Sequence, residues 1–132
     1  MYLRNWPSYC NGTCTRINMA NTFKNAWSKE VNHSAAETVY TAPATATSIL
    51  IGLTLTNKGA NDITATVTLH DDSNTGSGTD IIFLKDVSIP KNTALEVMRG
   101  NKIVLETGDM VKIQCNTEDV LNSFISVLEI TP

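Results

Sequence analysis

The sequence predicts an all-β fold: an antiparallel two-sheet β-sandwich of seven to eight strands with an extended N-terminal arm. Turn signals recur roughly every 8–12 residues from residue 37 onward, the spacing of a sandwich or barrel. No segment of helical length carries apolar residues at helical spacing, and without crossover helices the sheets should be antiparallel. Strand periodicity is clearest in residues 62–69, where threonines alternate with Ile63, Ala65, Val67 and Leu69.

Residues 49–69 contain the strongest local signal in the chain. They form two amphipathic segments joined by residues 57–61, where Gly59 can adopt a positive φ. This pattern predicts a β-hairpin. Two such strands need a second sheet over their apolar faces, which favours an Ig-like or a jelly-roll-like sandwich without deciding between them. The core-facing residues expected in the first strand share one parity: Ile49, Ile51, Leu53 and Leu55.

The remaining strands follow from the same rules. Pro43 and Pro90 end two of them, since proline cannot donate to a β-ladder. Residues 70–79 are rich in glycine and polar residues and predict an exposed loop. Cys115 lies on the apolar parity of its strand and is expected to be a small core residue. The predicted strands are 37–41, 81–89, 95–98, 103–106, 110–115 and 122–131.

Residues 1–36 are predicted to be an arm separate from a sandwich domain at 37–132. The arm lacks sustained periodicity, although a short helix at 20–30 is conceivable, and it holds most of the aromatic side chains. These side chains should dock, either on their own sandwich or on a neighbouring subunit; both alternatives stay open. Met19 is also a plausible second translation start. The expected arm anchors are Tyr2, Trp6, Phe23 and Trp27.

Two strand segments, 81–84 and 124–128, are apolar on both parities. A simple sandwich leaves one face of each sheet in water, so something should cover the outer apolar side chains. We therefore expect a homo-oligomer, a dimer or trimer, with Ile82, Leu84 and Leu128 as subunit contacts. The alternative is a β-bulge that exchanges the two parities partway along each strand.

The composition argues against nucleic acids and membranes as binding partners. A formal net charge of −3 and a pI near 5.2 argue against binding to nucleic acid, which requires a basic surface. No apolar run approaches the roughly 20 residues that span a bilayer, and the N-terminal residues lack the apolar stretch of a secretory signal. The expectation is a soluble, unexported protein without a membrane partner.

The sequence contains no recognisable motif for catalysis or metal binding. His33 and His70 are the only histidines, and neither lies in a nucleophile motif, so no enzyme, no catalytic residue and no cofactor is expected. Cys10 and Cys14 could form a disulfide, but they lack the two further ligands of a zinc site. The acidic loop at 70–80 lacks the distal glutamate of an EF-hand and is read as a solvated loop.

Several segments together resemble small β-sandwich virion structural proteins of tailed bacteriophages, especially phages of marine bacteria. Residues 19–26 look like the usual N-terminus of these proteins, whereas residues 1–18 depart from it. The resemblance covers about residues 19–131. The segments that carry it are 37–44, 88–97, 102–109 and 126–130.

This resemblance implies a non-enzymatic accessory part of the virion, assembled in the cytoplasm of the bacterial host. The expected role is a head decoration (cement) protein that binds itself and the major capsid protein, or another virion protein in the neck or tail. Repeated modest contacts would strengthen the shell through avidity. The alternative is a β-sandwich module of the neck, tail or fibre that binds a host receptor or glycan through the loop at 70–79.

Overall fold

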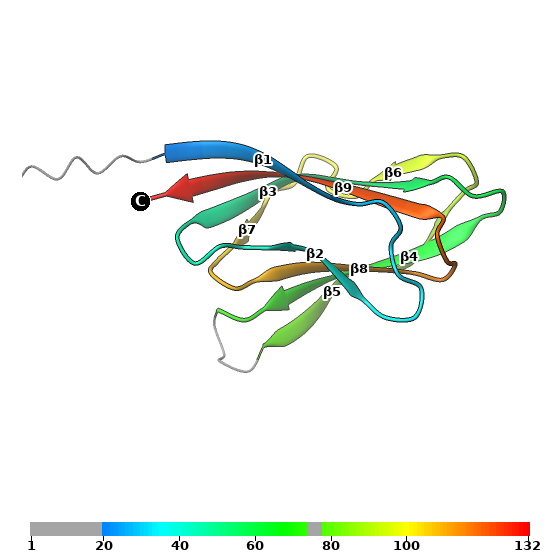
Figure 1. The fold of residues 1–132 in the computed structure, drawn as a ribbon, viewed down its shortest axis with the longest axis horizontal. Helices are drawn as coiled ribbons and strands as arrows, with labels where there is room; N and C mark the ends of the chain where they lie inside the picture. The colour runs from blue at the N-terminus through cyan, green and yellow to red at the C-terminus, as the bar shows by residue number, and fades with distance from the viewer. Residues whose placement is uncertain (1–19, 74–77) are drawn as a thin grey trace, which may run out of the picture.

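A computed structural model describes residues 20–73 and 78–132, which form nine strands in two antiparallel sheets (Figure 1). The expected two-sheet β-sandwich is confirmed. Sheet A holds five strands in the order β1, β9, β3 and β6, with β7 also pairing with β3. Their bounds are β1 Ala20–Ser28, β9 Leu121–Thr131, β3 Thr47–Asn57, β6 Ala94–Glu96 and β7 Ile103–Leu105. Sheet B orders β2 (Glu37–Thr41), β8 (Met110–Cys115), β4 (Ile63–Asp71) and β5 (Thr79–Ile89).

The strand order is that of a jelly roll. Strands β6 and β7 pair with opposite ends of β3 and share one position in sheet A, so the two sheets have four positions each. Among the described strands, β4 and β5 are the only consecutive pair joined by hydrogen bonds. An Ig-like sandwich would place its first two strands side by side in one sheet, and here β1 and β2 lie in different sheets.

Strands β3 and β4 do not form the predicted hairpin. The first belongs to sheet A and the second to sheet B, so the loop between them crosses from one sheet to the other. Both strands still bury one apolar face, because Leu53 and Leu55 fill the interior from one side and Ala65 and Val67 from the other. The alternation was interpreted correctly as two amphipathic strands, but it does not specify whether they pair or face each other.

The predicted arm ends much earlier than residue 36. Strand β1 replaces the conceivable helix at 20–30 and pairs with β9 along its whole length, from Ala20 opposite Thr131 to Ser28 opposite Ser123. The following loop is also anchored, since Val31 is 1% exposed and its N–H donates to the Leu121 carbonyl. Residues 20–36 are therefore part of the sandwich, and the predicted domain boundary is wrong.

A β-bulge explains the doubly apolar segment of β5. The register with β4 shifts twice near Val67, which lies opposite Leu84, whereas the next residue of β4 lies opposite Ile82. As a result Leu84 packs against the core, while Ile82 points outward and is 56% exposed. A second shift in β3, between Leu50 and Gly52, buries Leu50 in place of the expected Ile49.

The core is a single cluster between the two sheets. Cys115 belongs to it and is 2% exposed, which confirms its expected structural place. Sheet A contributes most of the large side chains, and β4 and β8 of sheet B face them. The largest fully buried side chains from these strands are Leu50, Leu53, Leu55, Ile63, Ile113, Leu121 and Ile125.

Candidate interaction surface

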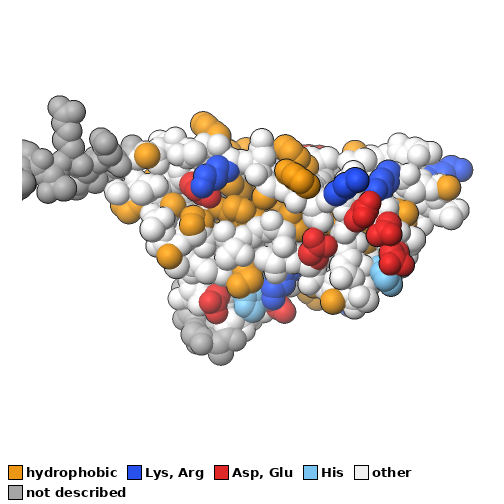
Figure 2. All heavy atoms as spheres, viewed as in Figure 1, with side chains coloured by type: hydrophobic (Ala, Val, Ile, Leu, Met, Phe, Trp, Pro, Cys, Tyr) orange, Lys and Arg blue, Asp and Glu red, His pale blue; other side chains and the backbone are white. Residues whose placement is uncertain are grey.

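The outer face of sheet A carries a continuous apolar row. Strand register places Phe23 of β1 opposite Leu128 of β9, which lies opposite Ile49 of β3, which in turn lies opposite Val104 of β7. Phe23 is 76% exposed and Val104 is 59% exposed. Side chains from four neighbouring strands thus form one stripe across the sheet, and hydrophobic atoms are visible along its β1 side (Figure 2).

A second row adds two large aromatic rings to this face. Trp27 of β1 lies opposite Phe124 of β9, and they are 68% and 46% exposed. The row continues through Thr54 to Glu96, whose carboxylate accepts a 2.8 Å hydrogen bond from the Thr54 hydroxyl. We call the six exposed or half-buried side chains of the two rows the apolar face: Phe23, Trp27, Ile49, Val104, Phe124 and Leu128.

The outer face of sheet B is polar. Its row through Ile82 continues through Thr68, Lys112 and Thr38, so the exposed isoleucine has no apolar neighbour across the strands. On sheet A the exposed apolar side chains cross four strands, whereas on sheet B the large exposed ones, Ile81, Ile82 and Phe83, are confined to the edge strand β5. An exposed apolar patch that spans several strands is typical of a contact surface in a soluble protein.

A hollow lies at one end of the apolar face. Trp27 and Phe124 line a cavity of about 310 Å³ together with Thr56 and Asn122. The Asn122 side-chain oxygen is buried and has no hydrogen-bond partner among the described residues. An unpaired buried acceptor is unfavourable by about 1–3 kcal/mol.

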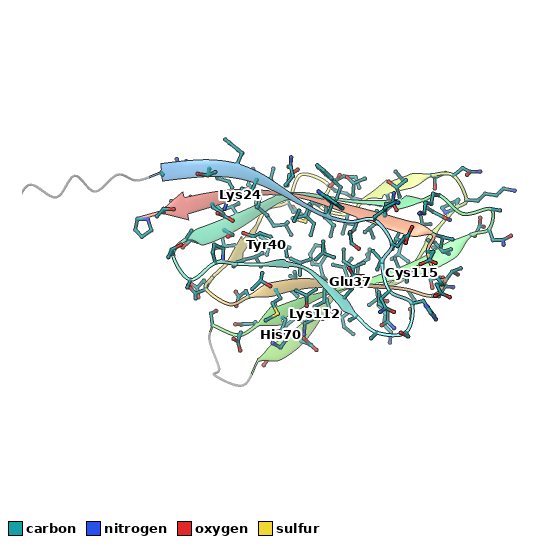
Figure 3. All side chains as sticks on the ribbon, viewed as in Figure 1. Lys24, Glu37, Tyr40, His70, Lys112 and Cys115 are labelled. Atoms are coloured by element: carbon teal, nitrogen blue, oxygen red, sulfur yellow. The ribbon has the colours of Figure 1, made fainter. Side chains whose placement is uncertain are left out.

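Strand β1 is held to the sandwich by a polar network between the sheets. The Lys24 ammonium lies 2.6 Å from the Glu129 carboxylate, which is buried and also accepts a 3.0 Å hydrogen bond from the Tyr40 hydroxyl. The Tyr40 hydroxyl lies 2.7 Å from the hydroxyl of Ser48. Figure 3 shows Lys24 and Tyr40 approaching from β1 and β2. The network thus links four strands and fixes the edge strand that presents Phe23.

Burial raises the pKa of Tyr40 above its ordinary value of 10.0, and the nearby Glu129 carboxylate acts in the same direction, against the Ser48 hydrogen bond. Since the folded pKa is raised, the associated stability is present below pH 10 and is lost as the pH rises through the folded pKa. We expect the free energy of unfolding to fall more steeply above pH 10 in the wild type than in Tyr40→Phe. Urea titrations at pH 8, 10 and 11 measure this difference, and parallel curves would contradict it.

The histidine at the end of β4 contacts an aspartate at the surface. His70 Nδ1 lies 2.6 Å from Asp80, which also contacts the Lys112 ammonium at 3.2 Å. The His70 hydrogen bond, followed by the Lys112 one, lowers the pKa of Asp80. The described residues place no serine or cysteine hydroxyl or thiol on this histidine, and they contain no cluster of three or more potential metal ligands. They also contain no helix able to span a membrane.

The predicted contact residues divide into four groups. Phe23, Trp27 and Leu128 meet on the apolar face, and Ile82 lies apart on the outer face of sheet B. Leu84 packs on the core and offers little surface to a partner. Tyr2 and Trp6 lie outside the described residues. Sequence reasoning missed the other members of the apolar face, because their meeting depends on strand register: Ile49, Val104 and Phe124.

No family model matches this chain, and no curated protein is similar to it. Among solved structures, one similar chain comes from work described as "Bacillus endospore appendages form a novel family of disulfide-linked pili". The two chains share 11% sequence identity with a TM-score of 0.54, over 91% of this chain and 96% of the other. At this identity the likeness concerns the fold, and it agrees with the two-sheet β-sandwich.

Proposed function

We propose that this chain is a non-enzymatic structural protein of a bacteriophage virion, a head decoration protein that binds the capsid lattice and stabilises the shell. The observation that supports this function is the contrast between its two outer surfaces. Sheet A presents the apolar face, whereas sheet B presents mainly threonines and charged side chains, with its large exposed apolar residues confined to the edge strand β5. A protein that lies on a lattice needs one surface to bury against the lattice and one to remain in water.

The apolar face suits a modest contact that is repeated many times. Burial of exposed Phe and Trp side chains is favourable by about 25 cal/mol per Å² of apolar area, and aromatic residues dominate binding energy at protein interfaces. Each copy need contribute only a weak contact, since many linked copies on a shell bind with high avidity. Contacts between copies, as a dimer or trimer, would use a different part of the surface.

The fold is compatible with this role. The resemblance of several segments to small phage virion proteins provides the specific assignment, and the similar Bacillus chain belongs to pili, which are also assemblies of repeated subunits. The described residues have a complete core and a surface whose largest exposed side chains are apolar. Both features suit a subunit whose work is contact rather than catalysis.

Removal of the two most exposed rings should weaken attachment to the shell. We expect Phe23→Ser combined with Trp27→Ser to weaken binding to shells at least tenfold, because burial of these rings against the lattice would be lost. Co-sedimentation with capsid shells measures this binding. Ile82→Ser is the matched control, since Ile82 is an exposed apolar residue on the polar outer face.

The unfolding midpoint of each variant in urea should stay close to that of the wild type, which separates loss of contact from loss of fold. Equal effects of the double variant and Ile82→Ser would contradict a specific role for the apolar face. Cryo-electron microscopy with a labelled antibody fragment locates the chain on particles. Label on the neck or tail instead of the head lattice would refute the decoration role.

A saccharide-binding role is the second candidate, and the hollow beside Trp27 favours it. Sugars stack on exposed aromatic rings and use amide and hydroxyl partners, and here Trp27 and Phe124 lie beside Thr56 and Asn122. Few aromatic residues lie in the strands, but the pairing of β1 with β9 places Trp27 opposite Phe124. Binding on a glycan array that is lost in Trp27→Ser and retained in Ile82→Ser would support this role over decoration.

A further inference from the structure

A second apolar surface lies where the sandwich opens along one side. The inner rows of the two sheets end there at Leu69 and Ile81 on strands β4 and β5, and at Ile103 on β7. Val104, which belongs to the apolar face, lies at the border of this surface. Together they line a cleft of about 340 Å³. Ile81 is 52% exposed although its parity faces the core. Inward-facing apolar side chains of both sheets are thus exposed to solvent at this edge.

The rim of this cleft is acidic. Asp71, Glu106 and Asp109 line it, and among the described residues no lysine or arginine does. The Asp109 carboxylate is already occupied by backbone N–H groups, whereas Glu106 lies at the surface with a 3.2 Å hydrogen bond from Ser73. His70 is the one basic side chain in the lining and is paired with Asp80. A partner for this cleft should be apolar and cationic.

Residues 1–19 have this composition. They hold Arg4 and Arg16 and none of the chain's thirteen acidic residues, whereas residues 20–132 hold eight basic residues against those thirteen. They also contain Tyr2, Trp6 and Tyr9. Nineteen residues can extend over roughly 60 Å, which is longer than a small domain is wide, so the segment is long enough to reach another copy.

We infer that residues 1–19 of one copy bind the cleft between β5 and β7 of a neighbouring copy, with an aromatic side chain between the sheets and an arginine beside Glu106. This inference rests on the proposed function, because it supplies the link between subunits of the assembly. The apolar face, apart from Val104 where it borders the cleft, remains free for the shell. The two surfaces then have separate tasks: one joins copies to each other, and the other joins them to the lattice.

Photo-cross-linking of the full chain tests this contact. A benzoylphenylalanine replaces Trp6, unlabelled and ¹⁵N-labelled protein are mixed before assembly, and cross-linked tryptic peptides are identified by mass spectrometry. We expect cross-links from position 6 to the peptide 103–112, about half of them between a light and a heavy copy. The yield should fall several-fold in 0.5 M NaCl, because salt screens the arginine–carboxylate attraction.

Charge reversal gives the matched controls. Glu106→Lys should lower the cross-link yield about tenfold, and Arg4→Glu with Arg16→Glu should restore it in that variant. Glu118→Lys makes the same charge change at an exposed loop outside the cleft and should leave the yield unchanged. Cross-links only within single copies, or to β1 and β9, would overturn the inference. Loss of shell binding in the apolar-face variant would still stand, so the two proposals fail separately.

Discussion

Asp109→Ala is expected to lower the free energy of unfolding by about 3 kcal/mol or more, since it removes three charge-assisted hydrogen bonds at once. One carboxylate oxygen accepts the backbone N–H groups of Asp72 and Ser73 at 3.1 and 3.2 Å, and the other accepts the Glu106 N–H at 2.9 Å. The side chain is 7% exposed, so water cannot easily replace it. It joins the loop after β4 to the turn between β7 and β8.

Urea denaturation followed by circular dichroism measures this loss. Glu118→Ala is the control, because it removes a carboxylate from an exposed loop and should change stability by less than about 0.5 kcal/mol. Asp109→Asn should fall between the two, since an amide keeps one acceptor but turns an N–H toward one of the backbone donors. If Asp109→Ala unfolded at the same urea concentration as the control, the anchoring role of this carboxylate would be refuted.

Local periodicity predicted the strands well and their partners poorly. The alternation around Val67 and the parity of Cys115 were sufficient to identify β4 and β8, because burial on one face depends on neighbouring residues in sequence. The pairing of β3 with β9 instead of β4 depends on how the loops cross between sheets, and the alternation is identical in both arrangements. The same limit applies to β1, whose partner lies about a hundred residues away.

The contact residues also differ in whether the local sequence could identify them. Phe23 and Trp27 could be selected as aromatic side chains without a local core, and they lie exposed on the apolar face. Val104 could not, since a single valine in a short strand has no distinguishing signal until the register places it in a row with Ile49. The bulge that turns Leu84 inward was foreseen only as an alternative, because the sequence shows two apolar parities but not the point of exchange.

The crossing between the sheets depends on a buried amide at the end of β3. Asn57 is fully buried, and its side-chain NH₂ group donates to the carbonyls of Asn61 and Ile89 at 2.9 and 3.0 Å. Its side-chain oxygen accepts the Gly59 N–H at 2.8 Å. One side chain thereby forms hydrogen bonds with two backbone groups of the loop from β3 to β4 and links this loop to the end of β5. A leucine of similar volume would remove all three of these hydrogen bonds.

Asn57→Asp should therefore be among the most damaging single-atom changes in the chain, with a loss of about 3–5 kcal/mol at pH 7. The new carboxylate would face two carbonyl oxygens in a fully buried site, so its ionised form is disfavoured and its pKa is raised in the folded state. Stability should then recover as the pH is lowered toward 4, since a protonated acid can donate to one carbonyl again. Urea titrations at pH 7 and pH 4 measure both effects. Asn101→Asp, which adds the same charge at an exposed position, should show neither the loss nor the recovery, and identical behaviour of the two variants would refute the role of the buried amide.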